Sequence, residues 1–223
     1  MRAGQLALQF PQGRGGARRG AGRKALPAPL RHTPHRAREE HRKAHPVHVT
    51  LRAGLRSLRH QQVVRTVLKS MRDSNRDWFR IAHYSVQDNH LHLIVEAESK
   101  ASVASGMRGL AVRMARRVNR LLFRRGRFWA DRWHGRELTS PRQVRNALVY
   151  VLQNHRKHAP ARSSAAELDA LSSAQWFTGF VEKLPPDFRA VGPPCLVAPR
   201  TWLLRTGWQR CGLIGFNEAP KMR

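Results

Sequence analysis

The segment "HYSVQDNHLHLIVEAE" (residues 83–98) contains two apolar runs separated by the polar triplet QDN. Asp and Asn favour turns because their side chains bond to nearby backbone groups. The runs on either side, residues 78–87 and 90–98, have the length and the apolar, β-branched content of strands. We therefore predict a β-hairpin, with His90 and His92 at the start of its second strand.

Further segments on both sides of this hairpin show the periodicity of regular structure. Alternating apolar and polar residues predict strands, and apolar residues three or four apart predict helices. The predicted strands are 46–54, 78–87, 90–98 and 127–138, and the predicted helices lie within 57–78, 99–126 and 141–158. This order, β-α-β-β-α-β and a last helix, predicts an α+β fold of the ferredoxin-like, split βαβ type. We expect a four-stranded antiparallel sheet with its helices on one face and its other face open to a ligand.

The chain divides into three parts by composition. Residues 1–45 are rich in Gly, Pro and Arg, which predicts a disordered basic arm. Residues 46–160 hold the predicted strands and helices and form the expected domain. Residues 161–223 include apolar side chains that could pack back onto this domain, and we interpret them as an accessory segment.

The charge of the chain points to a polyanionic partner. Lys and Arg number 42 against 14 Asp and Glu, a formal net charge of +28. Such an excess is typical of nucleic-acid binding, where each phosphate contact releases counterions. No apolar run approaches the ~20 residues of a membrane span, and we expect no signal peptide. The two cysteines fit neither a zinc site nor a disulfide framework. We therefore expect a cytoplasmic protein associated with the nucleoid.

The paired histidines could bind a metal ion. Because strand side chains alternate, His90 and His92 point to one face, about 7 Å apart along the strand, and can close on one divalent ion. The alternative is one hydrogen-bonded structural histidine and one exposed histidine. Glu96 shares this face, and we expect it to be a solvated residue at the rim rather than a support for the ligands.

The last predicted helix carries a tyrosine and an asparagine on one face. Tyr150 and Asn154 are four residues apart, so the phenol and the amide project side by side from a helix. The alternative for Tyr150 is a core aromatic residue. Tyr84 is the other of the two tyrosines in the chain.

Together these motifs resemble those of the HUH endonucleases. The stretch "NHLHLIVE" is similar to their His-hydrophobic-His strand, and "VYVLQNHRKH" is similar to the single-tyrosine helix of their transposase branch. There, the tyrosine is followed by three residues and then Asn or Gln. "RFWADRWHGREL" and "GGARRGAGRK" resemble the preceding strand and the N-terminal arm of the REP-associated tyrosine transposases, which act on palindromic repeats. His155 departs from the pattern, because the family often has Pro there.

The resemblance implies a metal-dependent DNA transposase. Tyr150 would cleave and rejoin hairpin-flanked single-stranded DNA through a 5′-phosphotyrosine, and His90, His92 and Asn154 would bind Mg²⁺ or Mn²⁺. The partners would be single-stranded or hairpin DNA and, in a possible homodimer, a second copy of the chain. The residues expected to contact DNA are Arg14, Arg18, Arg19, Arg23, Lys24, Arg113, Arg116, Arg117, Arg120, Arg124, Arg125 and Arg127.

Other readings of the sequence stay open. The protein could be a non-catalytic binder of palindromic DNA repeats, or a basic protein that binds structured RNA. A zinc hydrolase is not supported, because the sequence has no HExxH motif. Trp129 and Trp133 could stack on unpaired bases or belong to the core.

Overall fold

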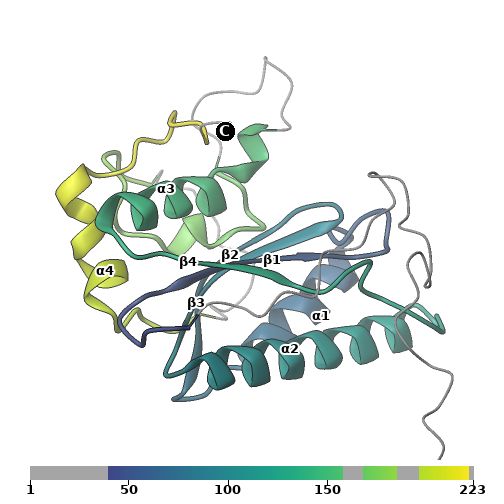
Figure 1. Ribbon diagram of the computed structural model, residues 1–223. Helices are drawn as coiled ribbons and strands as arrows, with labels where there is room; N and C mark the ends of the chain where they lie inside the picture. Colours follow the sequence, from purple (N-terminus) through teal and green to yellow (C-terminus); the bar gives the residue numbers. More distant parts are fainter. Residues whose placement is uncertain (1–39, 158–167, 185–195, 221–223) are drawn as a thin grey trace, which may run out of the picture. The chain divides into compact units, whose positions relative to one another are not determined.

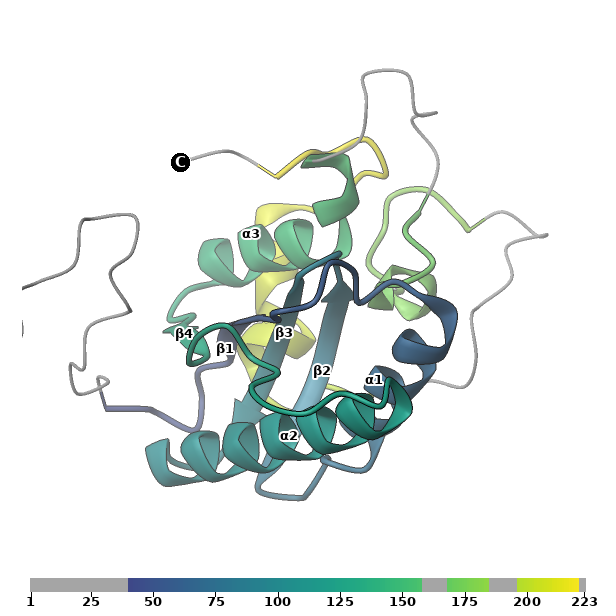
Figure 2. The ribbon, with the colours of Figure 1, turned by 90° about the vertical axis from the view of Figure 1, so that its right-hand side faces the viewer.

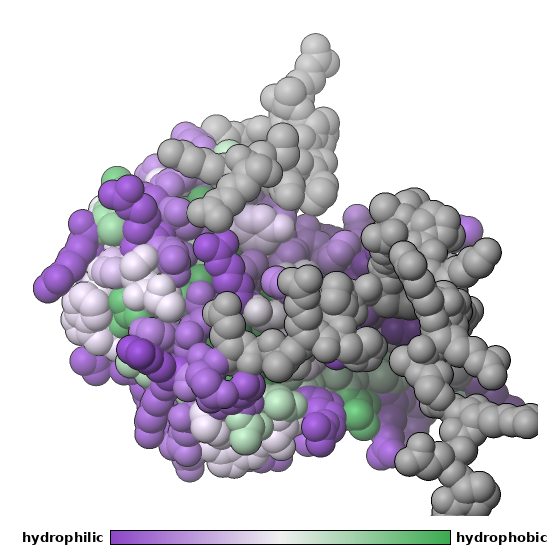
Figure 3. Space-filling view, in the orientation of Figure 1, coloured by the Kyte–Doolittle hydropathy of each residue, from purple (hydrophilic) through white to green (hydrophobic). Residues whose placement is uncertain are grey.

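The computed structural model describes residues 40–157, 168–184 and 196–220, all within one compact unit, His35–Arg223. The five basic residues expected in the arm, from Arg14 to Lys24, lie outside this part of the chain. Among the residues described, no helix is long and apolar enough to cross a membrane. On the face of the molecule shown in Figure 3, hydrophilic residues cover most of this described surface and hydrophobic patches are small.

Four strands form one antiparallel sheet in the order β2-β3-β1-β4 (Figure 1). Strands β2 and β3 are the predicted hairpin, and their connection is the turn at Asp88 and Asn89. This order of strands and helices confirms the predicted α+β fold. The strands are β1 (Val47–Arg52), β2 (Phe79–Val86), β3 (His90–Ala97) and β4 (His134–Glu137).

Helices α1 (Gln61–Arg72) and α2 (Lys100–Leu121) cover one face of the sheet (Figure 2). The Ser99 side chain caps α2 by accepting a hydrogen bond from the backbone N–H of Ser102. The apolar residues of β1 and β3 that point to this side are fully or almost fully buried against both helices. They are Val47, Val49, Leu51, Leu91, Leu93 and Val95.

The opposite face is covered as well, so the expectation of an open face was wrong. Helix α3 (Pro141–Leu152) lies across it (Figure 2), together with α4 (Trp202–Arg205) and the short 3-10 helix η4 (Gly207–Cys211). The physical reason is that Ala82 and Ile94 make part of this face apolar, and the apolar side of α3 buries them.

Helix α3 begins as the sequence predicts and ends earlier. The Ser140 side chain accepts from the Gln143 backbone N–H, and proline occupies the first turn. The α-helix stops at Leu152, and a 3-10 turn, η2 (Asn154–Lys157), replaces the last turn of the predicted helix. Tyr150 therefore lies near the C-terminal end of α3, where the chain changes from one helix type to the other.

The predicted fourth strand is mostly loop. Only His134–Glu137 pair with β1, while an isolated bridge joins Ala53 to Trp129. Trp129 donates its indole N–H to the Ala111 carbonyl at 2.9 Å, and both Trp129 and Trp133 pack against the core. Of the two alternatives for these tryptophans, the structure supports the core role.

Segments from the C-terminal region cover one edge of the sheet. The Val86 N–H donates to Leu171 O at 2.9 Å, and the Val197 N–H donates to Ile81 O at 3.2 Å. One outward-facing donor and one outward-facing acceptor of β2 thus find partners. Strand β4 forms the other edge.

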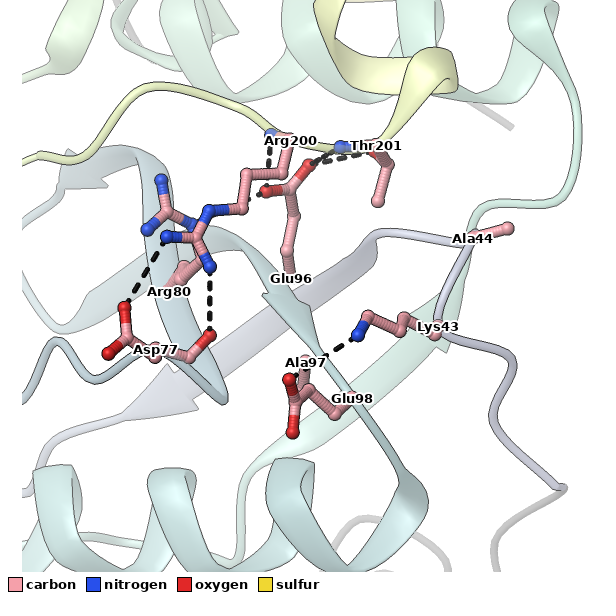
Figure 4. Close-up of a pocket in the computed structure, with 9 residues that line it drawn as sticks. All are labelled: Lys43, Ala44, Asp77, Arg80, Glu96, Ala97, Glu98, Arg200 and Thr201. Carbon is pink, nitrogen blue, oxygen red and sulfur yellow. Dashed lines mark hydrogen bonds and ion pairs between the residues drawn. The ribbon is translucent and has the colours of Figure 1, made fainter.

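Glu96 holds the C-terminal segment against β3, so the expectation of a solvated residue was wrong. The residue is only 3% exposed. One carboxylate oxygen accepts from the Arg200 N–H at 2.8 Å, and the other accepts from the Thr201 N–H at 2.8 Å and the Thr201 hydroxyl at 2.7 Å (Figure 4). Thr201 in turn caps α4. This carboxylate therefore fixes the point at which the chain returns to the sheet.

Replacing Glu96 by glutamine should destabilise the fold by about 1–3 kcal/mol. The amide nitrogen would face N–H donors, which leaves one buried donor of Arg200 or Thr201 without an acceptor. Urea unfolding followed by circular dichroism measures the change. Glu98→Gln is the matched control, because Glu98 makes only an exposed pair with Lys43 and its loss should change stability by less than about 0.5 kcal/mol. Equal stability of the two variants would show that the Glu96 carboxylate does not hold the C-terminal segment against β3.

His83 should make the stability depend on pH. Burial on the α3 side of the sheet lowers the pKa of His83 from 6.5 to about 4. The unfolded chain therefore takes up a proton that the folded chain refuses, and stability falls as the pH drops from 6.5 to 4. His83→Phe should remove up to about 3 kcal/mol of this dependence. Urea unfolding at a series of pH values tests it, and an unchanged pH dependence would exclude this role.

Candidate functional site

Helix α3 brings Tyr150 onto the histidine side of β3. The rings of His90 and His92 lie nearly parallel, with centroids 6.1 Å apart. The Tyr150 ring meets the His92 ring edge-on at a centroid distance of 5.1 Å. The structure thus brings together three of the four residues predicted for the reaction centre. They come from a strand and a helix, and His92 and Tyr150 are 58 residues apart in the sequence.

Both predicted ligand histidines use Nδ1 in hydrogen bonds to neighbouring side chains. His90 Nδ1 lies 2.6 Å from Asn89 Oδ1, and His92 Nδ1 lies 3.2 Å from Thr50 Oγ1. An amide oxygen only accepts, so His90 Nδ1 donates, which places the lone pair of the neutral ring on Nε2. Histidines that bind metals are commonly oriented by a hydrogen bond of this kind.

A third histidine, which the sequence analysis did not single out, completes the cluster. The His48 ring on β1 lies 5.7 Å from the His92 ring and 5.5 Å from the Tyr150 ring. Burial lowers the pKa of His48 to about 4, with smaller effects from His134 and Arg136, so its ring is neutral at neutral pH. Its Nε2 is buried and has no hydrogen-bond partner among the residues that the structure describes.

Two signals in the sequence could have identified His48. It alternates with the apolar residues of β1, so it lies on the same sheet face as Thr50. In the split βαβ pattern β1 and β3 are neighbours, and the register places Thr50 opposite His92. The missing information was this register, which periodicity alone does not provide.

Asn154 lies one turn after Tyr150, at the first position of η2. Its side chain is buried, with the residue 1% exposed, and Oδ1 has no hydrogen-bond partner within the described ranges. A buried amide oxygen without a partner is energetically unfavourable unless another group meets it. No cluster of three His, Cys, Asp or Glu side chains suited to a metal occurs in the described part of the chain.

The second tyrosine is on the wrong side of the sheet for the same chemistry. Tyr84 is fully buried in the core beneath α1 and α2, at 0% exposure. Tyr150, by contrast, is partly exposed. This arrangement leaves Tyr150 as the one tyrosine that both faces the histidines and reaches the surface.

Residues 41–154, more than half of the 223 residues, match the family described as "Transposase IS200 like". The chain belongs to the IS200-like transposase family. The matched region contains His48, His90, His92, Tyr150 and Asn154. Members of this family are DNA transposases, and this assignment confirms the family predicted from the sequence motifs.

A solved structure shares the fold of this IS200-like transposase. It is described as "Structure of the REP associates tyrosine transposase bound to a REP hairpin". The two chains are 14% identical with a TM-score of 0.53, and the similarity covers 72% of this chain and all of that chain, 100%. None of the curated proteins matches the sequence.

The arginines of α2 differ in their surroundings. Arg113 and Arg117 bond to the end of α1, through Ser74 and Asp73 respectively, so these two have structural partners. Arg116 and Arg120 are exposed on α2, and Arg125 and Arg127 are exposed in the loop that follows. Helix α2 itself lies on the face of the sheet opposite to α3, the helix that carries Tyr150 (Figure 2).

The loop after α2 nevertheless returns to the histidine end of the sheet. Gly54 N–H donates to Phe128 O, and Ala130 N–H donates to Arg52 O, both at 2.8 Å. Arg52 is the residue of β1 that pairs with His90. The basic loop is therefore connected directly to the strand end at which the transposase presents its paired histidines.

Two cavities in the described region lie elsewhere. One of about 380 Å³ lies beside Glu96 (Figure 4), and one of about 810 Å³ lies along β4 and the start of α2. Neither has His90, His92 or Tyr150 in its wall. The smaller cavity is lined by as many acidic as basic side chains, which does not favour a phosphate.

Proposed function

We propose that this transposase cleaves and rejoins single-stranded DNA beside a hairpin, with Tyr150 as the nucleophile. The observation that carries the proposal is the contact of the Tyr150 ring with the ring of His92, 5.1 Å between centroids, on the sheet face that also presents His90. The net charge of +28 favours a nucleic acid as substrate. The hairpin is suggested by the relative whose structure is described as bound to a REP hairpin.

The reaction conserves the phosphodiester energy. Tyr150 Oη forms a bond to the scissile phosphorus while the bond from phosphorus to the 3′ oxygen breaks. The phenol loses its proton and the departing 3′ oxygen gains one, which leaves a 5′-phosphotyrosine and a 3′-hydroxyl end. Attack by a 3′-hydroxyl on the phosphotyrosine reverses the step and rejoins DNA. No nucleotide triphosphate is required.

We infer that His90, His92 and Asn154 would hold a divalent cation, Mg²⁺ or Mn²⁺. The hydrogen bond from His90 Nδ1 to Asn89 directs the Nε2 lone pair outward from that bond, and Asn154 Oδ1 lacks a partner. When bound, such an ion polarises the phosphate and offsets its developing charge. Imidazole ligands suit Mn²⁺ better than Mg²⁺. His48 stays neutral because of its lowered pKa, so it adds no positive charge that would repel a cation.

The basic residues position the DNA. The exposed side chains Arg116, Arg120, Arg125 and Arg127 present positive charge on α2 and the loop after it. In this proposal they contact phosphates of the strand that enters the site, and the arm from Arg14 to Lys24 adds further contacts. Because the proposed substrate is DNA, we expect the protein to act in the cytoplasm, at the nucleoid. If two copies act together, one copy can hold the strand that the other has cut.

Trapping a covalent adduct tests this function. A DNA hairpin with a single-stranded 5′ flank, labelled on either side of the cleavage position, is incubated with the full chain and Mn²⁺. We expect a denaturation-resistant protein band that carries only the label located 3′ of the cleaved bond. Tight DNA binding without an adduct would instead indicate a non-catalytic binder. Preference for structured RNA over this DNA in a competition assay would indicate an RNA-binding protein.

A further inference from the structure

The residue that ends helix α2 is an exposed phenylalanine in a left-handed conformation. Phe123 has φ 51°. Among the residues that the structure describes, it is the only residue other than glycine with a positive φ. It is also 96% exposed, more than any other large apolar side chain in the described part of the chain. The sequence predicts a helix within residues 99–126, but α2 ends at Leu121.

The backbone around Phe123 forms a helix-ending motif in which glycine is the usual residue. Phe123 N–H donates to Arg120 O at 3.2 Å, and Arg124 N–H donates to Asn119 O at 2.8 Å. In this motif the residue at the position of Phe123 must be left-handed, where a Cβ is unfavourable. The bonds satisfy helix carbonyls whichever residue is present. The phenyl ring therefore adds nothing to the motif and makes its conformation less favourable.

The surroundings of the ring are strongly basic. Arg120 precedes it, and Arg124, Arg125 and Arg127 follow it in the same loop. The Asn119 side chain donates to Gly126 O at 3.0 Å and so fixes the loop across its base. Nη1 of Arg124 is buried and has no hydrogen-bond partner among the described residues. An exposed aromatic ring among cationic side chains matches single-stranded nucleic acid, which offers phosphates and unstacked bases together.

We propose that Phe123 stacks on an unpaired base of the DNA strand that the loop leads to the histidine end of the sheet. This inference rests on the proposed function, because it assigns a contact to the same single-stranded substrate. The loop returns from Phe123 to Arg52, the partner of His90 in the sheet. A duplex does not offer such a base, since its bases are already stacked on one another. Phe123 thus distinguishes the single-stranded flank from the paired stem.

Phe123→Gly separates stacking from folding, because the two effects have opposite signs. Glycine relieves the left-handed conformation, so the melting temperature should be unchanged or higher by about 2–4 °C. Loss of one stacked base should weaken binding to a hairpin with a single-stranded flank by about 5- to 150-fold. Binding is measured by fluorescence anisotropy without divalent metal, which prevents cleavage. Val112→Ala is the control, since Val112 is an exposed apolar residue of α2, 46% exposed.

A second variant reports the contact directly. Phe123→Trp should keep wild-type affinity, and its fluorescence should be quenched by the single-stranded flank and not by a blunt duplex of the same length. Wild-type affinity of Phe123→Gly for the flanked hairpin would overturn the inference, as would an equal loss on blunt duplex. Adduct formation by the wild-type chain is scored separately. If the wild type neither forms an adduct nor binds single-stranded DNA, the proposed function fails and this inference fails with it.

Discussion

Tyr150→Phe is expected to abolish the covalent protein–DNA adduct, with a loss of at least about 1,000-fold in strand cleavage. Phenylalanine keeps the ring that packs against His92 and His48 but lacks the oxygen that would bond to phosphorus. Folding and DNA affinity should therefore stay close to wild type. Gel separation of the adduct under denaturing conditions measures the first effect, and fluorescence anisotropy with the same oligonucleotide measures the second.

The control for this variant is Tyr84→Phe. Tyr84 is the other tyrosine and is buried on the far side of the sheet, so removing its hydroxyl should leave the adduct intact once circular dichroism shows a folded chain. An adduct that persists in Tyr150→Phe would remove Tyr150 from the mechanism. An adduct lost in both variants would show that the assay reports folding rather than chemistry.

The double change His90→Ala with His92→Ala is expected to lower metal-dependent cleavage by at least about 100-fold. Both proposed nitrogen ligands are then missing, and Asn154 alone offers too few donors to hold a divalent ion. DNA binding without metal should change little, because the arginines that attract phosphates are untouched. Titration calorimetry with Mn²⁺ gives the loss of the ion site independently of cleavage.

The control for the histidines is His60→Ala. His60 is exposed at the start of α1, and its side chain makes no capping bond. The variant removes an imidazole that is not part of the proposed site, so Mn²⁺ binding and cleavage should stay at wild-type levels. Cleavage that survives the loss of His90 and His92 would exclude the proposed ion site.

The sequence was informative wherever neighbours along the chain determine the structure. The hairpin of β2 and β3 follows from two apolar runs and a polar turn, and the common face of His90 and His92 follows from strand alternation. The two covered faces of the sheet could not be predicted in this way. The layer over Ile94 is built from α3 and from residues more than 100 positions further along, such as Leu203 and Trp208.

The same limit applies to the site. His48 joins His92 and Tyr150 only through the register of β1 against β3, and Glu96 is buried only because Arg200 and Thr201 return to it. Both are long-range pairings with no local signature. The predicted end of α2 was wrong because of a local feature rather than a long-range pairing. Glycine is the usual left-handed residue, and the chain places phenylalanine there instead.

The covered edge of β2 limits how this sheet can grow. Leu171 and Val197 bond to the Val86 N–H and the Ile81 carbonyl of β2, while β4 is the edge at which no further strand of the described chain pairs. Of the two edges of the described sheet, β4 is therefore the one where a neighbouring backbone can pair. Two molecules that meet there, β4 against β4, pair both of these edges with each other, so strand pairing through β4 stops at two copies.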